Sequence, residues 1–272
     1  MKYSLRVSPA LFLIFFPLII SAQQTQSSQS DFINEILNRI PIEEKLKKAP
    51  QEIEAEFSQN PLGLPASKNE KLIELFGKGF VIDSLTTDVT KTFNSRFNSE
   101  HASSVISWLE EESTKKVMQA IEDSNTLQGS RRRVVRMYEL EQNPPTDQRE
   151  SIIQSLIKAT SAVESEIESQ TILFRSIVSA FSILSDQRNF SESQIDGIVS
   201  NYRFQIQNEM RNEIENRYLV SFFNLDNNLL REYVSFYNSD AGKWLNETIN
   251  TGIHTAYEKG AARFVESIRN VN

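Results

Sequence analysis

Apolar residues recur three, four and seven positions apart over nearly the whole chain. This spacing places them on one side of an α-helix, which can then bury that side against a neighbouring helix. The alternation of apolar and polar residues that marks a β-strand is absent over any comparable length. The pattern therefore predicts an all-α fold, a multi-helix bundle of antiparallel helices. Its first stripe consists of Phe32, Ile33, Ile36, Leu37 and Ile40.

Prolines predict where this helical pattern is interrupted, because proline lacks the backbone N–H of a helix interior. Pro41 stops the first stripe, a break is expected near Pro50, and Pro144 with Pro145 breaks the chain again. A loop is predicted over residues 60–67. Six helical stretches are expected around these breaks: about 67–97, from 99 to beyond 121, 127–140, from 147 to beyond 181, 191–218, and 229–268. The first of them should bend at Gly77 and Gly79, and the last should form a helix-turn-helix.

Three residue pairs have the spacing of a capping box, in which a residue before a helix and one three positions later satisfy free backbone N–H groups. They are Ser67 with Glu70, Asp147 with Glu150, and Ser191 with Gln194. Each pair predicts the start of a helix.

The first 22 residues have the layout of a secretory signal peptide. Lys2 and Arg6 give a positive start, residues 10–20 are apolar, and Ala22 is small. The layout predicts cleavage between Ala22 and Gln23 and export, to the periplasm of a Gram-negative bacterium or outside the cell. A retained membrane anchor is the alternative, but the run is short of the roughly 20 residues of a span. No transmembrane span is expected after cleavage.

Four segments are expected along the chain. They are the signal peptide 1–22, a flexible polar linker 23–30, an N-terminal helical half 31–143 and a C-terminal helical half 144–272.

Composition excludes several functions. The 36 acidic residues exceed the 29 basic ones, for a net charge of −7, so nucleic acid is not an expected partner. The chain contains no Cys, which excludes disulfides and a thiol nucleophile and leaves helix packing as the source of stability.

Two segments resemble each other and predict that the helical halves are related. Residues 106–117 read ISWLEEESTKKV and residues 234–245 read VSFYNSDAGKWL, at a constant offset of 128. Ser107 matches Ser235, Lys115 matches Lys243, and Trp108 matches Phe236. A helical hairpin that cannot bury its apolar side alone could do so against a second copy. Chance similarity between amphipathic helices is the alternative.

The sequence FYNSDAGK at 236–243 resembles the Phe-Tyr-x-Ser-x-x-Gly-Lys signature of the exported bacterial proteins grouped as domain of unknown function 2059. The resemblance covers about residues 190–265, with a degenerate copy near 70–120. It implies a signal peptide followed by helices, and it implies no activity. Asp240 stands where the family often has Pro, and in the first copy Glu111 and Thr114 replace the Ser and the Gly.

The motif has a structural and a functional interpretation. In the structural one, Ser239 caps a helix, Gly242 allows close approach of another helix, and Phe236 and Tyr237 anchor the corner in the core. In the functional one, Tyr237, Ser239 and Lys243 line a ligand site. The structural interpretation is favoured.

No catalytic constellation is present in the sequence. His101 and His254 are the two histidines, and neither lies in a zinc or di-iron motif. His254 and Glu258 share a helix face and could hold a metal, but a solvated surface pair is favoured. No cofactor is expected, and there is no phosphate-binding glycine loop. A hydrolase with two carboxylates remains open, because tertiary proximity is invisible in a sequence.

Arg131, Arg132, Arg133 and Arg136 form the one basic cluster. Salt bridges to the acidic helices are the expected role, with a bound anion as the alternative. Val134, Val135 and Tyr138 are expected to form the buried side of this helix.

The leading hypothesis is a non-enzymatic exported binding module for a partner protein or an apolar ligand, because paired helices with 17 Phe and 7 Tyr form apolar grooves. The alternatives are a carboxylate-based hydrolase and a structural or assembly protein.

Overall fold

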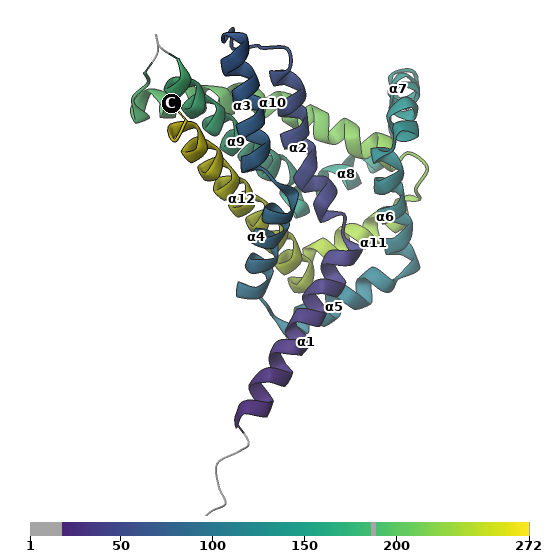
Figure 1. Ribbon diagram of the computed structural model, residues 1–272. Helices are drawn as coiled ribbons and strands as arrows, with labels where there is room; N and C mark the ends of the chain where they lie inside the picture. Colours follow the sequence, from purple (N-terminus) through teal and green to yellow (C-terminus); the bar gives the residue numbers. More distant parts are fainter. Residues whose placement is uncertain (1–17, 186–188, 272) are drawn as a thin grey trace, which may run out of the picture.

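The computed structural model describes residues 18–185 and 189–271, and these residues form helices without a strand. The predicted all-α multi-helix bundle is confirmed (Figure 1). The helices are α1 (Leu18–Arg39), α2 (Ile42–Phe57), α3 (Ala66–Gly79), α4 (Ile82–Ser95), α5 (Ser99–Glu110), α6 (Glu112–Asn125), α7 (Leu127–Gln142), α8 (Asp147–Thr160), α9 (Ala162–Leu184), α10 (Glu192–Ser221), α11 (Asn227–Asn238) and α12 (Asp240–Arg269).

The predicted leader lies mostly outside the described residues, which begin at residue 18. The predicted cleavage point between Ala22 and Gln23 falls within α1, and the segment 23–30, expected as a linker, has helical backbone in α1. Farther along, Gln29 donates through Nε2 to the carbonyl oxygen of Asn94 at 3.0 Å. Ile33, Ile36 and Ile40 are buried, so this part of α1 belongs to the bundle.

Helix starts agree only partly with the predicted capping boxes. Ser191 and Gln194 form the complete box at the start of α10, as predicted. The box at Ser67 and Glu70 was wrong, because α3 begins at Ala66, after Pro65, with no side-chain cap. Proline before the first turn presets the backbone there without a capping side chain. At α8 the cap is Thr146, whose hydroxyl accepts a hydrogen bond from the backbone N–H of Arg149.

Several expected continuous helices are divided. Phe80 and Val81 separate α3 from α4, Glu111 separates α5 from α6, and Ser161 separates α8 from α9. Ser161 has a φ of 47°, in the left-handed region that ends many helices. A residue other than glycine adopts this conformation only singly, so the chain turns once at Ser161 and α9 begins directly after it.

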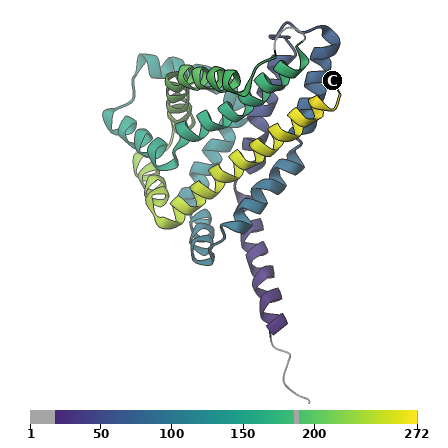
Figure 2. The ribbon, with the colours of Figure 1, turned by 90° about the vertical axis from the view of Figure 1, so that its left-hand side faces the viewer.

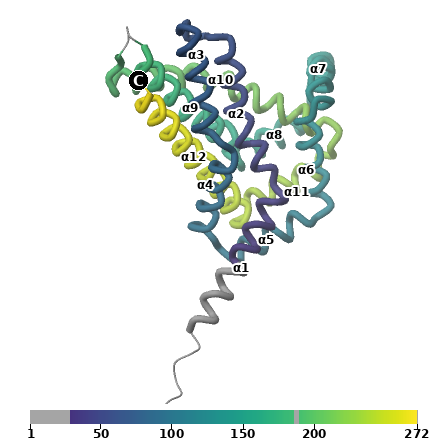
Figure 3. Tube along the Cα trace, viewed as in Figure 1, coloured from purple at the N-terminus to yellow at the C-terminus, as the bar shows by residue number. Residues whose placement is uncertain are grey.

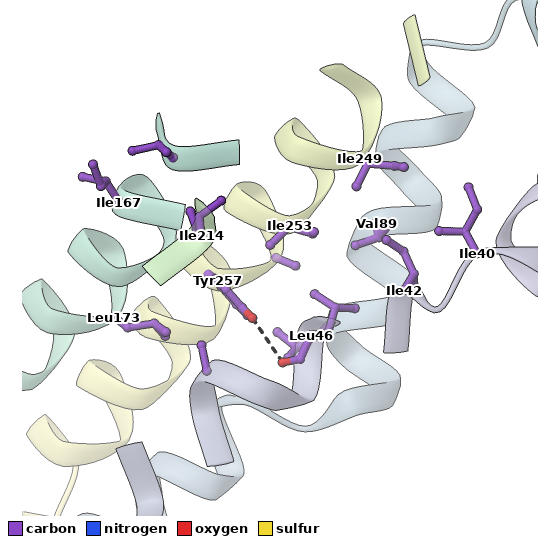
Figure 4. Packing of buried hydrophobic residues seen from close by; sticks show 14 of the residues in the cluster. Ile40, Ile42, Leu46, Val89, Ile167, Leu173, Ile214, Ile249, Ile253 and Tyr257 are labelled. Carbon is purple, nitrogen blue, oxygen red and sulfur yellow. Dashed lines mark hydrogen bonds between the residues drawn. The ribbon is translucent and has the colours of Figure 1, made fainter. Parts of the chain in front are cut away.

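Pro50 does not break α2, which runs through it. A proline inside a helix deprives the carbonyl four residues earlier of its N–H partner, and here that carbonyl belongs to Leu46. The buried hydroxyl of Tyr257 on α12 donates to the carbonyl oxygens of Leu46, at 3.3 Å, and Lys45, at 3.1 Å (Figure 4). Tyr257 therefore replaces the hydrogen bond that Pro50 removes, which lets the helix continue.

The long helix α12 is the common partner of the bundle. It packs most extensively against α4 and α9 and also contacts α3, α5, α8 and α11 (Figure 2). Its buried side chains include Leu245, Ile249, Ile253 and Phe264. Figure 4 shows Ile249 and Ile253 facing Val89 of α4 and the labelled residues of α2, Ile42 and Leu46. One apolar core thus joins residues from both predicted halves.

A buried carboxylate connects α4 to α12. Asp88 is 5% exposed and pairs with Lys259 at 2.9 Å, Arg263 at 3.4 Å and Lys91 at 3.6 Å. Burial alone would raise the pKa of Asp88, but the hydrogen bonds and charges of these cations outweigh it and leave the pKa below its ordinary value. The charge of Asp88 is therefore compensated inside the bundle.

Candidate functional site

The motif at 236–243 forms the corner between α11 and α12. The Ser239 hydroxyl accepts a hydrogen bond from the backbone N–H of Gly242 at 3.1 Å and donates to the carbonyl oxygen of Phe236 at 2.7 Å. A Cβ on Gly242 would overlap that same carbonyl oxygen. Ser239 is thus the predicted N-cap, and Gly242 is required because α11 ends against the first turn of α12.

The two aromatic motif residues pack against α5. The ring of Phe236 stacks on Trp108, with centroids 3.7 Å apart, and Tyr237 meets Trp108 edge-on at 5.7 Å. Burial raises the pKa of Tyr237 to about 12, although a hydrogen bond with Tyr233 offsets part of the rise. Both side chains therefore have the anchoring role of the structural interpretation.

Lys243 is exposed, and its side chain makes no hydrogen bond or ion pair within the described part of the chain. The motif residues line neither the hollow beside α6 and α7 nor the one where α7 meets α8. Tyr237, Lys243 and the arginine cluster of α7 therefore do not converge on one cavity.

The apolar side of α7 is exposed, contrary to expectation. Val134, Val135 and Tyr138 are 73%, 58% and 64% exposed, and Leu127 is also exposed. At 3.6 residues per turn these four residues and Arg131 share one side of the helix, which we call the α7 stripe. Figures 1 and 3 show α7 at the edge of the molecule, above α6.

The opposite side of α7 packs through its arginines. Arg136 donates to the carbonyl oxygen of Val220 at 2.8 Å and lies over the ring of Phe223, 5.3 Å from its centroid. Arg132 donates to the carbonyl oxygen of Asp123 at 3.4 Å. These carbonyls belong to the last turns of α10 and α6, where free acceptors and the negative end of the helix dipole attract cations.

The expected salt bridges of this cluster were wrong. Among the described residues, none of its four arginines makes an ion pair. Because the guanidinium groups of Arg132 and Arg136 are held at these helix ends, those two arginines lie on the side of α7 toward α6 and α10, and the apolar stripe faces outward.

A hollow of about 470 Å³ lies between α6, α7 and the end of α10. Lys116, Arg132, Arg133 and Arg136 line it, and Asp123 is its one carboxylate. The side of α7 opposite the stripe is therefore basic, although the whole chain has a net charge of −7.

The remaining candidate residues do not form a catalytic group. His254 is half-buried, and its Nε2 lies 3.0 Å from the carbonyl oxygen and 3.3 Å from the hydroxyl of Ser165. His101 lies beside Trp244, with ring centroids 6.0 Å apart. Within residues 18–185 and 189–271 no group of three or more His, Cys, Asp or Glu side chains could hold a metal.

Among the described residues, α9 is the one helix that is long and apolar enough to cross a bilayer by length and composition. It packs against α10 and α12, and Arg175 in its middle forms an ion pair with Asp196. These contacts are those of a core helix.

Arg149, in the first turn of α8, and Arg231, in the second turn of α11, were not among the residues predicted from the sequence. One signal was present in the sequence: a cation near the start of a helix opposes the helix dipole.

No family model, no curated protein and no solved structure matches this chain.

Proposed function

We propose that this protein is a non-enzymatic, exported helical binding module, and that the α7 stripe docks an acidic amphipathic helix of a partner protein. The observation behind the proposal is the outward apolar side of α7, which contains Arg131, on a molecule with a net negative charge. Large apolar side chains exposed together at helical spacing mark a surface that another helix can cover.

A partner protein fits this surface better than a small apolar ligand. The helix α7 lies at the edge of the molecule (Figure 1), and the apolar residues of its stripe are exposed and line neither hollow. A small apolar ligand needs walls around it, whereas a helix can lie along a ridge with its own apolar side facing the stripe.

Charge favours an acidic partner. Arg131 lies within the stripe, and Lys116, Arg132 and Arg133 line the hollow on the other side of the same helix. A second copy of this chain docked through the same stripe about a two-fold axis would place the basic residues of both copies near each other, so self-association is disfavoured.

Binding of labelled peptides measured by fluorescence anisotropy tests the proposal. An acidic amphipathic helical peptide should bind, and a peptide of equal composition with its apolar residues scattered should not. Val134→Ser and Tyr138→Ser should each weaken binding by about tenfold, as for a residue central to an interface. Phe204→Ser is the matched control, because Phe204 is 79% exposed on α10.

Equal binding of both peptides, or equal loss in Phe204→Ser, would contradict the proposal. Binding to anionic vesicles without binding to the peptide would assign the stripe to a membrane surface instead. A dimer that Tyr138→Ser dissociates, seen by light scattering, would favour the assembly role.

Export is tested separately. Expression in a Gram-negative host should yield a periplasmic product whose first residue is Gln23, and an intracellular product that retains Met1 would overturn this part. The resemblance at 236–243 to an exported family supports the proposal of export.

No observation favours a two-carboxylate hydrolase, since each of the two hollows contains a single carboxylate, Asp226 in one and Asp123 in the other.

A further inference from the structure

A second hollow of about 620 Å³ lies where α7 gives way to α8 and where α10 turns into α11. Its polar side contains the first turns of α8 and α11, and Leu140, Leu219 and Phe223 supply an apolar side. The volume is in the range of sites for small molecules.

Positive charge converges on this hollow from two helices. Arg149 is the third residue of α8 and Arg231 the fifth of α11, and both line the hollow. The first turns of these helices also contribute the positive ends of their dipoles. Arg149 donates through Nη2 to the carbonyl oxygen of Leu225, and Arg231 donates to Oδ1 of Asn228 at 2.6 Å. Neither arginine forms an ion pair within the described part of the chain.

The carboxylates nearby compensate this charge only in part. Asp226 lines the hollow, but its side chain accepts a hydrogen bond from the backbone N–H of Asn228 at 2.7 Å, as the cap of its own helix. Asp147 and Glu150, in the first turn of α8, are exposed. Burial lowers the pKa of Arg149, and the charge of Asp226 offsets part of this fall.

Two buried polar atoms at this site have no hydrogen-bond partner. They are Nη1 of Arg149, a donor, and Oδ1 of Asn227, an acceptor. Buried polar atoms normally have partners, so each unpartnered one requires an explanation. An occupant that satisfied both would offer an acceptor to the guanidinium and a hydroxyl to the amide oxygen.

We propose that this hollow binds a phosphate monoester that bears an apolar group. The phosphate oxygens would accept from Arg149 and Arg231, its hydroxyl would donate to Asn227, and the apolar group would lie on Leu140, Leu219 and Phe223. Arginine pairs with helix N-termini are a recurrent means of holding phosphate. A soluble ester and a lipid headgroup share this chemistry. The site is separate from the α7 stripe and does not depend on peptide docking.

Isothermal titration calorimetry on the full chain tests the site with octyl phosphate, inorganic phosphate and octanoate as probes. Octyl phosphate should bind most tightly, because among the three probes it alone joins a phosphate to an apolar chain. Arg231→Gln should weaken its binding about tenfold, the loss of one charge-assisted hydrogen bond. Arg211→Gln, an exposed cation of α10 outside the hollow, is the matched control and should bind normally.

Arg149→Gln should weaken binding further, with an unchanged helical circular dichroism spectrum as the check that the variant folds. Vesicles of phosphatidic acid in phosphatidylcholine distinguish the sources: Arg231-dependent binding to them indicates a lipid headgroup, and binding of the soluble ester alone indicates a free metabolite. No heat at about 1 mM octyl phosphate, equal affinity for octanoate, or binding that Arg231→Gln leaves unchanged would overturn the proposal.

Discussion

The indole of Trp108 lies flat on the ring of Phe236, with centroids 3.7 Å apart and planes inclined by 3°. These two residues are also counterparts in the proposed repeat, at the offset of 128. A residue meets its own counterpart where two copies are related by a two-fold axis. The contact is therefore the one that a two-fold pairing of the hairpins α5–α6 and α11–α12 would produce, and the relationship of the two halves remains a prediction.

Truncation of this pair should reveal an interaction beyond ordinary burial. Trp108→Ala should destabilise the fold by about 3–5 kcal/mol, because a buried indole leaves a cavity. In a double-mutant cycle with Phe236→Ala, the coupling should be about 0.5–1.5 kcal/mol, the range for aromatic pairs. Urea denaturation followed by circular dichroism measures each free energy, and strictly additive losses would show that the stack adds nothing of its own.

Gly242→Ala should destabilise the protein by about 1–3 kcal/mol, because the new methyl group overlaps the carbonyl oxygen of Phe236. Gly197→Ala is the matched control, since a Cβ there meets nothing within 4 Å. It should stabilise α10 by about 0.5–1 kcal/mol through helix propensity. Thermal denaturation of both variants checks the opposite signs, and a shift of the same sign in both would contradict the close approach at Gly242.

Tyr257→Phe should lower stability by about 1–3 kcal/mol, because it leaves the Leu46 carbonyl buried and unpaired beneath Pro50. The loss should shrink in a Pro50→Ala background, where the alanine N–H can bond that carbonyl. Equilibrium unfolding of the two single variants and the double variant measures the difference. An equal loss in both backgrounds would show that the hydroxyl has no link to the proline.

Asp88→Asn should cost about 2–3 kcal/mol at pH 7, because Lys259 and Arg263 lose their shared carboxylate. The folded pKa of Asp88 is below its ordinary value. Its contribution is therefore present above about pH 4 and is lost as the pH falls through the folded pKa. Denaturation from pH 7 to 2 should show a shallower acid loss in the variant, whereas Lys91→Gln, with its exposed cation, should change stability by less than about 0.5 kcal/mol.

The helices were predictable because their signals are local. Apolar spacing, the Ser191 box and the cap at Ser239 depend on a few neighbouring residues, and the structure has them. Pro50 misled the prediction because its compensation comes from Tyr257, more than 200 positions later. A distant hydroxyl cannot be recognised from the sequence around a proline.

The orientation of α7 could not be predicted for a similar reason. Its pattern identifies an apolar side but does not reveal whether a neighbour covers it. The outcome depends on the carbonyls of Asp123 and Val220, which attract Arg132 and Arg136 to the inner side. The hollow with Arg149 and Arg231 likewise joins the starts of two helices about 80 residues apart, and only the tertiary fold brings them together.

The position of α12 at the end of the order of helices has a consequence during synthesis. A ribosome makes α3, α4, α5, α8 and α9 before the helix against which they pack. Until α12 has been synthesised, the apolar sides of these helices lack their shared partner and remain exposed on the nascent chain. Association with other chains is therefore a risk that lasts until α12 packs into the bundle.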